Sequence, residues 1–172
     1  MSRTIASRSA STGPTVGLLG SGVSLPRSLY VPCASTSRSN LVTSIQPELW
    51  VDHASEAVAF YEAAFGARVL HRIGDGDDIV AQLSVGDAAF WVTAASAPTK
   101  RFSPKAIDGT TSRTLLVVDN PDEVVAEAVA AGATEVSPVG EEHGWQIGRI
   151  VDPFGHEWEI GKPLEAWPPA AR

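Results

Sequence analysis

The sequence predicts an α+β protein built from two similar modules, each a strand and a helix followed by three strands. The first observation is a repeat, in which a strand and helix start at Leu49 and again at Leu116. The second is that the apolar spacing changes from helical to a period of two after each predicted helix. The residues that recur 67 positions later are Leu49, Val51, Asp52, Glu56, Val58 and Ala59.

The first module is predicted to span residues 44–94. A strand over 44–51 places Ile45, Leu49 and Val51 on one face, and the helix that follows ends at Gly66, where glycine adopts a left-handed backbone at low cost. Strands are predicted over 68–73, 78–85 and 88–94, because Gly- and Asp-rich turns separate them.

A linker over 95–111 leads to the second module, residues 112–163. Its helix is predicted to begin with a capping box at Asn120-Pro121-Asp122-Glu123 and to end at Gly132. Strands over 134–139, 145–151 and 157–161 follow. Residues 164–172 form a C-terminal tail.

Composition and charge exclude several classes of protein. The 172 residues are 44% hydrophobic and carry a net charge of −7, which argues against nucleic acid as the main partner. No apolar run approaches the length of a membrane span, and Cys33 cannot form an intramolecular disulfide. Residues 1–43 hold four arginines and no acidic residue, and we expect them to lie outside the core. They are either a targeting segment or the product of a start assigned too early; we favour the second and expect a cytoplasmic protein.

Two motifs carry a resemblance to a known family. They are Phe60-Tyr61-x-x-x-Phe65-Gly66 and the closing Asp152-Pro153-Phe154-Gly155-His156-x-Trp158. With the two modules, they resemble the vicinal oxygen chelate superfamily of glyoxalase I, extradiol dioxygenases and bleomycin-resistance proteins, and residues 148–156 are most similar to its PhnB-like branch. The resemblance implies a cupped, incompletely closed barrel with a small-molecule site on its concave face, and a homodimer.

Strand alternation identifies the side chains expected in that cleft. The face opposite Leu49 and Val51 carries Gln46, Glu48 and Trp50. The second module is expected to contribute Arg113, Trp145 and Glu159, with His143 in a loop at the mouth. Phe90 is placed in the cleft because it follows Gly86 by four residues, as Glu159 follows Gly155.

The resemblance also implies where a metal would bind. Metal-dependent members hold the ion with residues of the first and last strands of each module, which correspond here to Gln46, Phe90, Arg113 and Glu159. Phe90 and Arg113 are not metal ligands. We therefore expect no metal cofactor of the conventional kind, with a weakly bound divalent ion as the alternative.

Two functions are compatible with these residues. The first is a metal-free protein that binds a small polar or anionic molecule, in which Arg113 and Glu159 orient the ligand and Trp50 stacks on it. The second is a lyase, isomerase or dioxygenase-type enzyme with Glu48, His143 or Glu159 as its base. The alternative to both is that Arg113 and Glu159 form a purely structural salt bridge in a cleft that binds no ligand.

Overall fold

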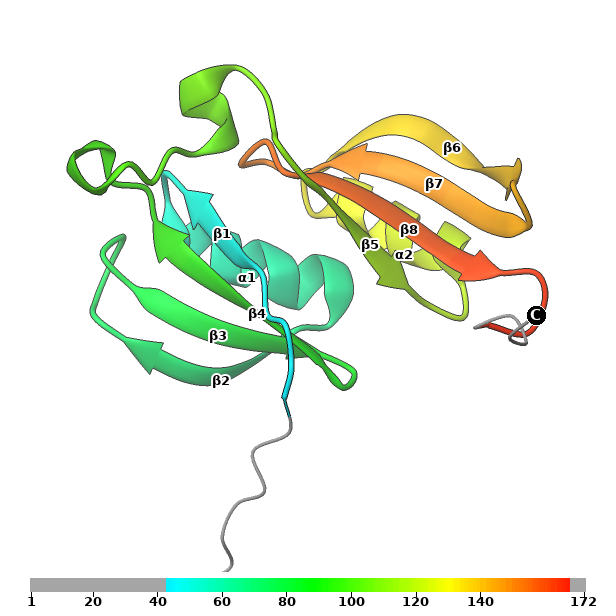
Figure 1. The fold of residues 1–172 in the computed structure, drawn as a ribbon, viewed down its shortest axis with the longest axis horizontal. Coiled ribbons are helices and arrows are strands. Elements are labelled where there is room, and N and C mark those ends of the chain that lie inside the picture. Colours follow the sequence, from blue (N-terminus) through cyan, green and yellow to red (C-terminus); the bar gives the residue numbers. More distant parts are fainter. Residues whose placement is uncertain (1–42, 168–172) are drawn as a thin grey trace, which may run out of the picture. The chain divides into compact units, whose positions relative to one another are not determined.

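The computed structural model of the protein describes residues 43–167, so nearly all of the predicted N-terminal tail and residues 168–172 lie outside it. The first module forms a four-stranded sheet in the order β1-β4-β3-β2 (Figure 1). Its elements are β1 (Glu48–Val51), α1 (Ala54–Phe65), β2 (Arg68–Ile73), β3 (Val80–Val85) and β4 (Ala88–Ala94).

The second module repeats this order, with strands arranged β5-β8-β7-β6. Its elements are β5 (Arg113–Val117), α2 (Pro121–Ala130), β6 (Thr134–Glu142), β7 (Trp145–Val151) and β8 (Glu157–Pro163). The linker contains two short 3-10 helices, η1 (Ala97–Thr99) and η2 (Pro104–Ile107).

Both sheets are mixed. The first strand of each module pairs in parallel with the last, β1 with β4 and β5 with β8, and the remaining pairs are antiparallel. A parallel pair needs a crossover connection, and α1 and α2 begin those crossovers. The predicted α+β fold of two four-stranded sheets is confirmed, and the sheets are not closed into a barrel.

Local sequence explains where the helices begin and end. Gly66 has a φ of 61°, and its N–H closes α1 by donating to the carbonyl of Tyr61, as the glycine predicts. The capping box predicted at α2 is wrong in its contacts. The side chain of Asn120 donates to Glu123 at 2.9 Å instead of accepting from the helix backbone.

An aromatic cluster joins the two modules in one core. Tyr61 of α1 is fully buried and lies 5.2 Å from Phe90 of β4 and 5.6 Å from Trp158 of β8, measured between ring centroids. Phe154 packs on the same cluster from the turn between β7 and β8. The two helices also pack against each other. The modules therefore share one apolar interior.

Asp152 fixes the turn before β8 inside this core. Its carboxylate accepts hydrogen bonds from the Tyr61 hydroxyl at 2.6 Å and the Trp158 indole at 3.0 Å, and from the backbone N–H groups of Phe154 and His156. Burial, followed by the charge of Asp152, raises the pKa of Tyr61. The predicted turn is therefore also a buried polar junction between the modules.

The start of the first strand differs from the prediction. Leu49 and Val51 are buried as expected, but Ile45 is 96% exposed. Strand β1 begins at Glu48, so the alternation of its side chains does not extend back to residue 45.

Within the described residues, neither helix is long and apolar enough to cross a membrane.

Candidate functional site

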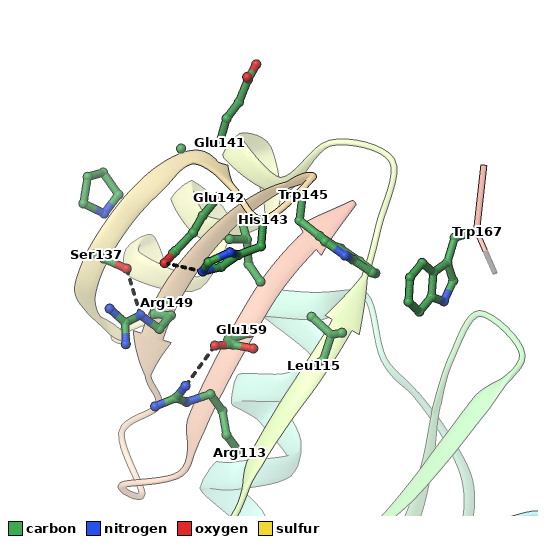
Figure 2. Close-up of a pocket in the computed structure, with 13 residues that line it drawn as sticks. Arg113, Leu115, Ser137, Glu141, Glu142, His143, Trp145, Arg149, Glu159 and Trp167 are labelled. Carbon is green, nitrogen blue, oxygen red and sulfur yellow. Dashed lines mark hydrogen bonds and ion pairs between the residues drawn. The ribbon is translucent and has the colours of Figure 1, made fainter. Parts of the chain in front are cut away.

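A hollow with a volume of about 700 Å³ lies over the second sheet, on the face opposite its buried core (Figure 2). Strand alternation builds it, because Ile150 and Ile160 point into the core while their neighbours Arg149 and Glu159 point into the hollow. The side chains that give it chemical character are Arg113, Leu115, Glu141, Glu142, His143, Trp145, Ile147, Arg149, Glu159 and Trp167.

Arg113 is held by two carboxylates on β8. Its Nη1 lies 2.9 Å from Glu159, and its Nε and Nη2 each lie 2.9 Å from one oxygen of Glu157. The hydrogen bonds to Glu157 and then to Glu159 raise the pKa of Arg113. The predicted contact of Arg113 with Glu159 is present, and Glu157 competes for the same guanidinium.

Arg149 is the second cation of the hollow and is bound differently. Its backbone lies opposite that of Glu159 in the sheet, but the Glu159 carboxylate pairs with Arg113. The Nε of Arg149 donates to the hydroxyl of Ser137 at 3.1 Å, and among residues 43–167 no carboxylate forms a salt bridge with it. Its terminal N–H groups are therefore available to a ligand anion.

Two tryptophans form the apolar end of the hollow. The rings of Trp145 and Trp167 meet edge to face, with centroids 5.3 Å apart and an angle of 67° between their planes. Trp167 remains 61% exposed and Leu115 remains 43% exposed. Figure 2 shows the two indoles side by side, apart from the guanidinium of Arg149.

His143 sits at the mouth, as predicted. It occupies the turn between β6 and β7 with a left-handed φ of 51°. Its side chain is 89% exposed, and its Nε2 lies 3.4 Å from Glu142. The imidazole borders the hollow, but no described contact fixes it against Glu159.

Phe90 does not face this hollow, which corrects the prediction. It is 7% exposed and packs on Tyr61 and Trp158 in the core. Counting from the turn glycines was wrong because β4 and β8, which both begin two residues after their turn glycine, pair with the first strands in registers that differ by one residue. By sheet register Leu49 pairs with Val92 and its counterpart Leu116 with Ile160. The residue of β4 equivalent to Glu159 is therefore Trp91.

Gln46 lies with Trp91 on the first sheet. Its amide oxygen accepts from the Trp91 indole at 2.9 Å and from the Gln82 amide at 2.8 Å. Gln46 and Phe90 border a smaller hollow of about 280 Å³, which Leu115 and Trp158 also line.

Glu48 and Trp50 border neither hollow. The indole nitrogen of Trp50 is buried, and no hydrogen-bond partner for it lies among the described residues. The structure thus does not bring Glu48 together with His143 and Glu159, or Trp50 together with Arg113.

Sequence reasoning missed three residues of these faces, Trp91, Arg149 and Trp167. Alternation along β7 from Trp145 would have placed Ile147 and Arg149 in the hollow with it. Trp91 was missed through the shift of one residue in β4. No pattern in the sequence places Trp167 near Trp145, because that contact depends on how the chain turns after β8.

Comparison with known proteins decides the family. The model of the Glyoxalase/Bleomycin resistance protein/Dioxygenase superfamily matches residues 42–160. The chain belongs to this superfamily. The uncharacterized protein Rv0887c of Mycobacterium tuberculosis is 32% identical over 135 residues, which cover 75% of this chain and 79% of that protein.

Solved structures of other proteins share the fold. TioX from Micromonospora sp. ML1 is 27% identical, with a TM-score of 0.55 over 72% of this chain and 98% of TioX. A bleomycin-binding protein in complex with bleomycin is 20% identical, with a TM-score of 0.51 over 70% of this chain and 98% of that protein. The second likeness shows the fold alone.

The residues at the metal positions of the superfamily do not fit a divalent ion. With the corrected register they are Gln46, Trp91, Arg113 and Glu159, of which two cannot coordinate a metal. The amide oxygen of Gln46 already accepts two hydrogen bonds, and Glu159 is bound to the Arg113 guanidinium. Within residues 43–167, no group of three or more His, Cys, Asp or Glu side chains is arranged to hold a metal.

Proposed function

We propose that this superfamily member binds a small organic anion in the hollow of the second sheet, without a metal in the superfamily's usual position. The observation that carries the proposal is the guanidinium of Arg149, which borders the hollow without a carboxylate partner in the described chain. A guanidinium binds carboxylate, phosphate or phosphonate groups through paired, charge-assisted hydrogen bonds.

The other charges of the hollow support this assignment. Glu157 and Glu159 share the single guanidinium of Arg113, and Glu142 lies beside His143. Arg149 is therefore the guanidinium of this hollow to which a ligand anion can bind without displacing a carboxylate of the described residues. In this proposal Arg149, and not Arg113 as predicted from the sequence, binds the anionic group of the ligand. Arg113 orients Glu159, whose carboxylate can accept a hydrogen bond from an N–H or O–H of the ligand.

Three further predictions accompany this one. They are the PhnB-like branch, a cytoplasmic location and a homodimer that covers exposed sheet edges. Light scattering tests the last of them, because a mass of about 18 kDa at micromolar concentration would contradict it.

Calorimetric titration with 4-phenylbutyrate and its neutral amide, 4-phenylbutanamide, tests the proposed function. The acid is expected to bind more tightly than the amide, and Arg149→Gln is expected to weaken acid binding about tenfold or more, which corresponds to about 1.4 kcal/mol. The matched control is Arg72→Gln, which removes the same charge from exposed strand β2.

Equal affinities for acid and amide would contradict an anion site. An acid affinity that Arg149→Gln and Arg72→Gln lower equally would show only a long-range effect of net charge.

A further inference from the structure

We propose that Trp145 and Trp167 form an aromatic recognition site that makes the hollow selective for flat aromatic acids, with Trp167 as a specificity-determining residue. This inference rests on the proposed function, because the same ligand would place its anionic group at Arg149. The inference adds that the other end of the ligand is aromatic. It also gives a role to the segment after residue 160, where the match to the superfamily model ends.

The chain after β8 is tied to the hollow. Strand β8 ends at Pro163, whose pairing partner in the sheet is Trp145. The N–H of Leu164 then donates to the carbonyl of Gly144 at 2.8 Å, in the turn that precedes β7. This bond holds the chain beside the start of β7, and only two residues, Glu165 and Ala166, separate Leu164 from Trp167.

The aromatic pair is open to a ligand. In an edge-to-face contact the edge of one indole covers one face of the other, so the remaining ring faces can stack on a ligand, and Trp167 keeps 61% of its surface exposed. Leu115 adds exposed apolar surface to the same hollow. A flat ring that stacks here would bury apolar surface from the ligand and from both tryptophans.

The spacing along β7 sets the shape of the ligand. Trp145 and Arg149 are four positions apart on β7 and face the same side. Their Cα atoms therefore lie about 13 Å apart, at roughly 3.3 Å per residue. The extended arginine side chain covers part of that distance. The ligand that fits both ends is an aromatic ring joined to an acid by a short chain.

The test compares two acids of equal length, 4-phenylbutyrate and 4-cyclohexylbutyrate, by calorimetric titration. Trp167→Ala is expected to weaken 4-phenylbutyrate about fivefold and 4-cyclohexylbutyrate less than about twofold, because only the flat ring stacks on an indole. The matched control is Phe102→Ala, which removes an exposed aromatic side chain of the linker. It is expected to change neither affinity.

The outcomes separate the two proposals. If both acids bind and depend on Arg149, but Trp167→Ala weakens neither acid or weakens both equally, the aromatic site is refuted and the anion site stands. If the wild-type protein binds neither acid, both proposals are overturned. Circular dichroism of each variant checks that its fold is retained.

Discussion

The two modules repeat one order of helix and strands but present different chemistry on equivalent faces. On the open face of the first sheet, Gln82 and Trp91 lie side by side on neighbouring strands and both donate to the amide oxygen of Gln46. At the equivalent positions of the second sheet stand Arg149 and Glu159. On the first face the amide and indole groups of Gln46, Gln82 and Trp91 bond one another, and Glu48 stands beside Trp91 on the neighbouring strand β1. The second carries two guanidinium groups, of which only Arg113 is paired with carboxylates.

This difference shows that a repeated backbone does not repeat a binding site. Strand pairing depends on backbone groups and on the apolar residues of the buried face, such as Val92 and Ile160, which the modules share. The open face is free to carry other side chains without loss of the fold. The binding properties of the second sheet therefore depend on its own side chains and cannot be inferred from the repeat.

The largest expected effect tests the register that equates Trp91 with Glu159. Phe90→Ala removes a core ring that packs on Tyr61 and Trp158 and is expected to lower the free energy of unfolding by about 3–5 kcal/mol. Trp91→Ala is the matched control, because it removes an aromatic side chain of the same strand from the open face and is expected to cost clearly less. Urea denaturation measures both. A greater loss for Trp91→Ala would reverse the assignment of the two faces.

The next effect compares the two turns that precede the last strands. Asp152→Asn leaves the Tyr61 hydroxyl and the Trp158 indole without their shared acceptor and is expected to cost roughly 2–4 kcal/mol. Asp87→Asn changes an exposed residue in the corresponding turn of the first module and is expected to cost less than about 0.5 kcal/mol. Thermal and urea unfolding of both variants measure these losses of stability. Equal losses for Asp152→Asn and Asp87→Asn would contradict this account.

The smallest effect concerns pH and a contact between the modules. His156 donates from Nε2 to the carbonyl of Trp50 at 3.1 Å, and burial lowers its pKa from the usual 6.5, although the nearby charge of Asp152 opposes the shift. The unfolded chain therefore takes up a proton at higher pH than the folded protein. Stability from this group is complete above about pH 7 and is lost as the pH falls through 6.5.

His156→Gln retains an N–H donor but does not titrate, so its unfolding free energy is expected to depend less on pH between about 5 and 7. His71→Gln, on exposed strand β2, is the control and is expected to keep the wild-type pH dependence. An unchanged pH dependence in His156→Gln would show that this histidine does not link the modules through its protonation.

The repeated fold could be predicted from the sequence alone. Apolar alternation and helical spacing are local properties, so they identified both helices, all eight strands and the end of α1 at Gly66. Alternation also placed Arg113, Trp145 and Glu159 on one open face, because these residues lie on strands whose buried neighbours are clear. The contact of Arg113 with Glu159 followed from that placement.

The alignment of the strands and the contacts of each side chain could not be predicted, because they depend on tertiary packing. Phe90 was misplaced because the register of β4 depends on its pairing with β1, which differs by one residue from the pairing of β8 with β5. Glu157 binds part of the Arg113 guanidinium, and Arg149 has no carboxylate partner among the described residues, through competition among neighbours that no spacing reveals. Trp167 reaches the hollow because of one backbone hydrogen bond at Leu164. Contacts between residues distant in sequence arise from packing, which local pattern does not encode.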